Sequence, residues 1–156
     1  MVAVNHEHSR ATRAPDPLSD ERASAQVVEA AVEITRRAEL GDPAGGYAFR
    51  SCNNAHDPPY QAVVHMTFLL PQGNSVGYLS GVGAAMTALG WTEAATPAEH
   101  FGRKLTRSGV TAVFYRNPER TDLATMRIYG ECRVVTDHRN DDPMWTELTD
   151  RLRRPR

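Results

Sequence analysis

The first regular pattern along the chain is a row of apolar residues at the spacing of one helix face: Ala23, Val27, Ala31, Ile34 and Ala38. Ser19 stands before this row as an N-cap, and acidic residues follow in the first turn. Gly41 and Pro43 are typical residues for the end of a helix. The pattern therefore predicts one amphipathic helix from about residue 19 to residue 40.

Two strands are predicted next. Residues 47–51 alternate between apolar and polar side chains, which is typical of a short strand. Residues 61–70 alternate too, but both of their faces are apolar, which indicates a central strand. The loop between them contains Asp57-Pro58-Pro59, a rigid turn sequence.

A second helix is predicted after the turn at residues 71–74, with Ser75 as its cap and a buried stripe of Leu79, Val82, Met86 and Leu89. Its glycines, Gly77, Gly81 and Gly83, each cost up to about 1 kcal/mol relative to alanine. They match neither nucleotide-binding fingerprint, so we interpret them as positions of close packing on a sheet.

The remaining pattern predicts a loop over 92–99 and three strands, over 101–106, 110–116 and 123–132, joined by short turns. A short helix is expected over 143–153. This order predicts an α+β fold, with two helices and the short C-terminal helix on one face of a mainly antiparallel sheet of about five strands. We expect a disordered leader over 1–18, a single domain over 19–153 and a basic tail over 154–156.

Composition limits the partners. The 156 residues include 18 Lys and Arg against 19 Asp and Glu, and the net charge of −1 gives no overall attraction for nucleic acid or an anionic membrane. Arg151, Arg153, Arg154 and Arg156 make the C-terminal end basic, and we interpret them as a solvated tail. Residues 62–71 are too short to span a membrane, and the first 25 residues lack the apolar segment of a signal peptide.

The two cysteines both stand at the ends of predicted strands. Cys52 follows the first strand, and Cys132 ends the last one. Strand ends in one sheet can come within disulfide range, so a Cys52–Cys132 disulfide is predicted. It would close a loop of about 80 residues, for which chain entropy suggests roughly 4 kcal/mol of stabilisation. The alternative is two buried free thiols.

Several blocks resemble a family of small lipoproteins from mycobacteria and related actinobacteria. They are Ser51-Cys52-Asn53 with Asp57-Pro58-Pro59-Tyr60, Tyr78-Leu79 with Ala84-Ala85-Met86 and Gly90-Trp91, Gly109-Val110-Thr111-Ala112, Tyr129-Gly130-Glu131-Cys132-Arg133, and Thr136-Asp137-His138-Arg139. The resemblance covers roughly residues 20 to 150. It implies an extracytoplasmic α+β domain tethered by a lipidated N-terminal cysteine, and it implies no particular reaction.

The chain departs from that family pattern at one point. Residues 1–51 contain no cysteine, and no apolar segment precedes the domain. Export therefore rests on the resemblance, and a cytoplasmic location stays open.

Metal and catalytic chemistry have weak signals. Cys52, His56, Cys132 and His138 could form a zinc set, but the spacing lacks the C-x2-C knuckle, so a disulfide beside two solvent-facing histidines is preferred. His65 lies in mid-strand, where a packing role is favoured. No G-x-S-x-G sequence is present. We therefore predict no catalytic residue, no metal and no cofactor.

A disulfide would bring two polar groups together. The predicted binding residues are Asn53, Asp57, Tyr60, Arg133, Asp137 and His138. The aromatic residues Tyr60, Trp91, Phe101 and Tyr129 stand near predicted element ends and would add a binding patch if they shared an exposed face. More often such residues close the core.

The function predicted is that of a soluble, cell-envelope-type domain that binds a protein or a small molecule and is not an enzyme. Two alternatives stay open: a small metal-dependent or hydrolytic enzyme, and a cytoplasmic partner protein of the immunity type.

Overall fold

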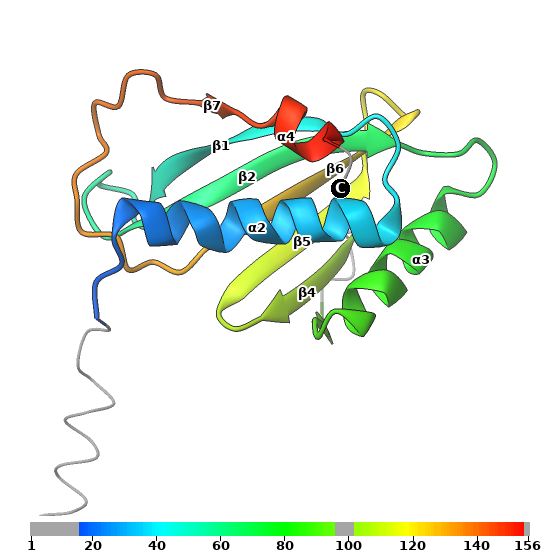
Figure 1. The fold of residues 1–156 in the computed structure, drawn as a ribbon, viewed down its shortest axis with the longest axis horizontal. Helices are drawn as coiled ribbons and strands as arrows, with labels where there is room; N and C mark the ends of the chain where they lie inside the picture. The colour runs from blue at the N-terminus through cyan, green and yellow to red at the C-terminus, as the bar shows by residue number, and fades with distance from the viewer. Residues whose placement is uncertain (1–15, 96–101, 155–156) are drawn as a thin grey trace, which may run out of the picture.

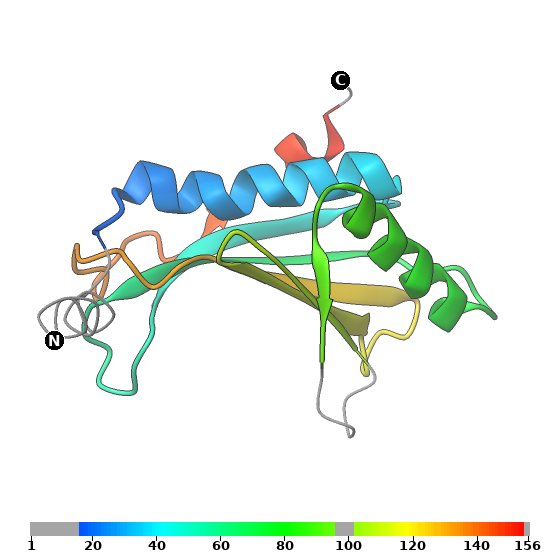
Figure 2. The same cartoon turned by 90° about the horizontal axis from the view of Figure 1, so that it is seen from below.

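Three helices lie on one side of a seven-stranded sheet in the part of the chain that the structure, a computed structural model, describes: residues 16–95 and 102–154 (Figures 1 and 2). The helices are α2 (Asp20–Ala38), α3 (Ser75–Ala88) and α4 (Thr149–Arg153). The strands are β1 (Ala44–Ser51), β2 (Tyr60–Leu69), β3 (Thr92–Ala94), β4 (Arg103–Arg107), β5 (Val110–Arg116), β6 (Leu123–Tyr129) and β7 (Thr146–Glu147). They pair in the order β3-β4-β5-β6-β2-β1-β7, and every neighbouring pair is antiparallel.

Helix α2 forms as its sequence pattern predicts. The Ser19 side chain accepts a hydrogen bond from the Arg22 amide, which caps the first turn. The helix ends at Glu39, whose backbone is left-handed, with φ 52°. Four residues of the predicted stripe are buried, and only Ala38 is half-buried. The stripe packs on β2 and β6, which places α2 across the middle of the sheet (Figure 1).

The core lies between the helices and one face of the sheet. On β2 and β6 the side chains that face the helices are fully or almost fully buried: Tyr60, Ala62, Val64, Met66, Phe68, Ala124, Met126 and Ile128. Alternation then places the other residues of these strands on the opposite face, where no helix of the described residues lies (Figure 2). We call that second face the open face.

Helix α3 is capped by Asn74, one residue before the predicted cap, through a hydrogen bond from the Gly77 amide. Of its glycines, only Gly83 is buried, and a Cβ there would come within 3.0 Å of the Arg103 side chain of β4. Gly81 faces open space. Close packing on the sheet is therefore confirmed at one of the three glycines.

The α+β class and the position of the helices on one face are confirmed, but the prediction of about five strands is wrong. Strand β3 lies inside the predicted loop 92–99 and pairs with β4. Strand β7 lies inside the predicted helix 143–153, which is helical only over α4. Both strands are two or three residues long and lie at the sheet edges. Their pairing depends on a neighbouring strand and leaves no alternation in the sequence.

The ends of the domain are only partly described. Residues 1–15 of the expected leader and residues 155–156 of the expected basic tail lie outside the described residues. Leu18, the last residue of that leader, is buried, and its amide donates a hydrogen bond to the Arg133 carbonyl. Leu18 thus packs with the domain.

Candidate functional site

Cys52 and Cys132 are joined by a disulfide, as the strand ends predict, with their Cα atoms 6.2 Å apart. Cys52 opens the loop that follows β1, and Cys132 lies three residues beyond β6. Tyr60 and Val134 pair through two backbone hydrogen bonds of 2.7 and 3.0 Å beside the bond. These contacts fix the loop before β2 against the chain segment that follows β6.

Asn53 organises the first of these segments. Its side-chain oxygen accepts hydrogen bonds from the amides of Ala55 and Asp57. Its amide nitrogen lies 3.3 Å from the Asp57 carbonyl oxygen. The polar atoms of Asn53 therefore hold the loop 53–57 in shape rather than pointing freely into solvent.

Tyr60, Asp137, Arg139 and Asp57 form a chain of polar contacts across the two segments. The buried Tyr60 hydroxyl lies 2.9 Å from the Asp137 carboxylate and 2.7 Å from the His56 carbonyl oxygen. Arg139 pairs with Asp57 at 2.7 Å and with Asp137 at 3.5 Å. Burial raises the pKa of the Tyr60 hydroxyl. The Arg139 amide, followed by the Tyr60 hydroxyl, lowers the pKa of Asp137.

His138, the residue between Asp137 and Arg139, contacts Phe49 and two further carboxylates. Its ring stacks on Phe49 with the ring centroids 3.9 Å apart and the planes 6° from parallel. One ring nitrogen lies 2.9 Å from Asp141, and the other lies 3.0 Å from Asp20 at the start of α2. The side chain is only 8% exposed. His138 therefore joins α2 to the C-terminal segment. We call Asp57, Tyr60, Asp137, His138 and Arg139 the disulfide cluster.

Arg133 points elsewhere. Its guanidinium pairs with Glu131 at 3.0 Å and donates to the Asp16 carbonyl oxygen. The structure thus places Asp57, Tyr60, Asp137 and His138 together, with Asn53 in the adjoining loop, and Arg133 in a separate contact. The sequence reasoning did not select Arg139, Asp20 or Asp141, although Arg139 directly follows two of the predicted residues.

The disulfide also affects the zinc alternative, because it uses the sulfur atoms of both cysteines. His56 is exposed, at the tip of its loop, while His138 is held by two carboxylates. Among the described residues, no group of three or more His, Cys, Asp or Glu side chains is placed to hold a metal ion.

Two of the four aromatic residues close the core, which is the alternative that the sequence favours. Tyr60 and Trp91 are buried in the core, and Phe101 lies outside the described residues. Tyr129 lies half-buried on the open face. Tyr60, Trp91 and Tyr129 therefore share no exposed surface.

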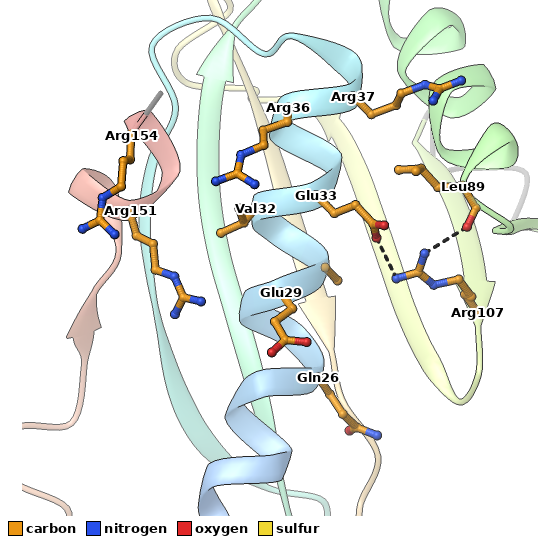
Figure 3. A pocket seen from close by; sticks show the side chains of 11 residues that line it. Gln26, Glu29, Val32, Glu33, Arg36, Arg37, Leu89, Arg107, Arg151 and Arg154 are labelled. Atoms are coloured by element: carbon orange, nitrogen blue, oxygen red, sulfur yellow. Dashed lines mark hydrogen bonds and ion pairs between the residues drawn. The ribbon is translucent and has the colours of Figure 1, made fainter. Parts of the chain in front are cut away.

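A second candidate site lies over the outer side of α2, away from the sheet. Here a hollow of about 830 Å³ is bordered by α2, α4, the end of β4 and the residue after α3 (Figure 3). The charged side chains that line it are Glu29, Glu33, Arg36, Arg37, Arg107, Arg151 and Arg154. We call this hollow the arginine groove.

The arginines of the groove differ in their partners. Arg107 pairs with Glu33 at 3.0 Å, donates to the Leu89 carbonyl and lies over the Trp91 ring at 4.8 Å. Arg36 and Arg151, by contrast, form no ion pair within the described part of the chain, and Arg154 forms none there either. Figure 3 shows these three on the side of α2 that faces α4. Part of the predicted basic tail therefore lies beside a basic residue of α2.

Comparison with known proteins gives one consistent family. A family model described as "Putative lipoprotein LppJ" matches residues 19–151. Proteins of that name from two strains of Mycobacterium tuberculosis (CDC 1551 / Oshkosh and ATCC 25618 / H37Rv) and from Mycobacterium bovis are 42% identical to the chain over 140 residues. The match covers 89% of this chain and 73% of each relative. No solved structure matches the chain.

Proposed function

The chain belongs to the family described as "Putative lipoprotein LppJ", and from this membership we propose that it is a domain of the cell envelope that binds an anionic ligand without catalysis. The relatives are named as lipoproteins, and the resemblance noted in the sequence implies the same compartment. No helix among the described residues is long and apolar enough to cross a membrane.

The disulfide supports the placement in the envelope. Structural disulfides persist in oxidising compartments and are rare where thiols are kept reduced. In this chain the bond links segments 80 residues apart and lies among ordered hydrogen bonds, so it acts as a structural link.

The observation that carries the ligand proposal is that Arg36, Arg151 and Arg154 line one hollow. The two last residues come from α4 and the residue after it, and the first comes from the last turns of α2. Arginine offers a planar fork of donors that suits carboxylate and phosphate groups. Of the two acids that line the groove, Glu33 pairs with Arg107, and Glu29 forms no ion pair within the described residues. The excess positive charge favours an anionic ligand.

The disulfide cluster is a second candidate position, because it contains residues that the sequence selects for binding. Asp57 and Arg139 have side chains about half exposed, at 52% and 48%. A ligand there would have to replace the ion pair between them. The unpaired arginines of the groove need no such exchange, so we place the ligand in the groove.

Binding of inorganic pyrophosphate and of citrate, measured by titration calorimetry at constant ionic strength, tests the groove. We expect saturable binding that weakens at least tenfold in the double variant R36Q/R151Q, because each lost arginine removes a charge-assisted hydrogen bond worth about 1.5–3 kcal/mol. Arg22→Gln, an exposed arginine of α2 outside the groove, is the matched control and should bind as the wild type does. Absence of saturable binding, or an equal loss in the control, would contradict the proposal.

Thiol titration under denaturing conditions tests the compartment separately. Protein isolated from its native host should show no free thiol, because both cysteines are in the disulfide. Two free thiols would refute the envelope placement while leaving the test of the groove intact.

A further inference from the structure

The open face of the sheet is positively charged, although the whole chain is not. The register places Ala44, Gly46, Ala48 and Arg50 of β1, the odd-numbered residues 61–69 of β2, Lys104 and Thr106 of β4, Thr111, Val113 and Tyr115 of β5, and the odd-numbered residues 123–129 of β6 on this face. Among the described strands the register adds one acid to this face, Glu147 of β7, which is opposite Gly46. Arg50, Lys104 and Arg127 are cations on the same face, and His65 can become one. The net charge of −1 therefore hides an uneven distribution.

Three of these groups lie in one row across the strands. Lys104 is opposite Val113, Val113 is opposite Arg127, and Arg127 is opposite His65. Neighbouring strands are about 4.8 Å apart, so the row from Lys104 to His65 extends about 14 Å. A small anion can reach only one or two groups of such a row, whereas an extended anionic surface can meet all of them.

Aromatic and apolar side chains surround the row. Tyr129 lies two residues from Arg127 on the same face, and its hydroxyl raises the pKa of Arg127, with a smaller contribution from Tyr115. Trp145 crosses β1 at Gly46, where an added Cβ would lie 2.3 Å from the indole nitrogen. Its ring meets the His65 ring edge-on at 6.2 Å.

Several of these side chains are also accessible. Trp145 is 36% exposed, its neighbour Met144 is 67% exposed, and Leu69 at the end of β2 is 45% exposed. Tyrosine and tryptophan are enriched where proteins meet the headgroup region of a membrane, and lysine and arginine there contact anionic headgroups.

From this arrangement we propose that the open face docks on the anionic phospholipid surface of a membrane, with Lys104, Arg127 and Arg50 toward the headgroups and Trp145 at the interface. The inference rests on the envelope placement proposed above, which would keep the domain near such a surface. The two hollows that border α2 and α3 lie on the helix side, whereas the row of side chains on the open face extends over four strands. A planar partner is therefore a better match than a small molecule.

The state of His65 gives the proposal a direct spectroscopic readout. Burial, then Arg127 of β6 and Arg50 of β1, lower the pKa of His65. Trp145, which packs against the ring, is uncharged, and the acid Glu147 lies in the same cross-strand row, one strand beyond Gly46. An anionic surface placed over this face would offset the two arginines, so membrane binding should raise the pKa of His65.

Co-sedimentation with phospholipid vesicles tests the docking. The chain of 156 residues should bind vesicles that contain phosphatidylglycerol and phosphatidylcholine, should not bind vesicles of phosphatidylcholine alone, and should be released by salt. Each basic residue near an anionic membrane contributes enough for about a fivefold change in partitioning. Arg127→Gln should therefore lower the bound-to-free ratio about fivefold, and K104Q/R127Q about 25-fold.

Two controls keep the test specific. Arg22→Gln, which removes the same charge from an exposed position of α2 outside both the arginine groove and the open face, should leave vesicle binding within twofold of the wild type. Circular dichroism should show that each variant is folded. In NMR titrations of the wild type, the His65 resonance should titrate at higher pH with the anionic vesicles than without them.

Three results would overturn the inference. One is equal binding to neutral and anionic vesicles, or no binding to either at low salt. Another is an unchanged His65 titration in the bound state. The third is a protein that does not bind vesicles but binds a soluble anionic polysaccharide, such as heparin, through Arg127. That result would assign the open face to an anionic polymer. Failure of pyrophosphate to bind the groove would leave all of these readouts unaffected, so the two proposals fail separately.

Discussion

Replacement of both Cys52 and Cys132 by alanine should destabilise the domain strongly without unfolding it. The bond closes a loop between residues 80 apart. Chain entropy assigns about 4.5 kcal/mol to a closed loop of that length. Domains of this size are stable by about 5–15 kcal/mol, so the variant should keep a smaller but positive free energy of unfolding.

The loss in the free energy of unfolding should stay near the value from chain entropy, because the contacts around the disulfide can remain without it. Hydrogen bonds beside the disulfide, such as those between Tyr60 and Val134 and from Cys52 to Pro59, do not need the sulfur atoms. The native state can therefore keep its shape when the bond is removed, and the main effect falls on the unfolded chain, which gains conformational freedom.

Urea unfolding followed by circular dichroism and tryptophan fluorescence measures the effect. For a slope of about 2 kcal/mol/M, the midpoint should fall by about 2 M. Reduction of the wild type with dithiothreitol should reproduce the shift, whereas the double variant should not respond to the reductant. A midpoint within about 0.5 M of the oxidised wild type would refute the assignment of the bond as a major source of stability.

Three further outcomes are expected from single substitutions. Gly45→Ala would place a Cβ against the backbone oxygen of His65 and should lower the free energy of unfolding in urea by about 1–3 kcal/mol. Gly81→Ala, on an open helix surface, should raise it by up to about 1 kcal/mol. Equal effects of the two substitutions would contradict the close approach of β1 to β2. Tyr60→Phe should lower the melting temperature and raise the pKa of Asp137 toward its usual value, as followed by carboxyl NMR, and an unchanged Asp137 titration would refute the contact. Because the folded state lowers the pKa of His65, the stability from this group is present above pH about 6.5 and is lost as the pH falls through the folded pKa. His65→Gln should therefore make the free energy of unfolding less dependent on pH on the acid side. A pH profile identical to that of the wild type would show that the lowered pKa is absent.

The elements with a strong periodic pattern could be predicted from the sequence. Helix α2 and strand β2 each have an apolar face of several residues, and both form close to their predicted limits. Strand β7 could not be predicted, because its two residues are Thr and Glu and its position depends on Trp145 lying over Gly46. Such contacts join residues that are far apart in the sequence, and no local pattern records them.

The same distinction applies to the candidate sites. The cysteines identify which two segments meet, so four of the predicted binding residues do come together at the disulfide. Their partners could not be foreseen: His138 contacts Asp20, which is 118 residues away and stands out in the sequence only as an acid of the first helical turn. These partners show that the polar groups predicted to face a ligand also bind one another.

The arginine groove and the open face were missed for a related reason. The net charge of the whole chain does not show how charge is distributed over its surfaces. Here the two basic surfaces lie on opposite sides of one sheet. Helix α2 and the sheet layer separate Arg36 and Arg151 from Arg127 and Lys104, so a ligand in the groove and a membrane on the open face would not touch the same side chains. Acidic residues such as Asp20, Asp57 and Asp137 gather instead near the disulfide, where ion pairs and hydrogen bonds join the two segments. Other acids, such as Glu33, Asp42 and Glu93, pair with arginines elsewhere in the fold. Within the described residues, cations on both broad faces, such as Arg36 and Lys104, form no ion pair. This separation is what would allow the domain to lie on an anionic surface while its groove remains open to a second anion.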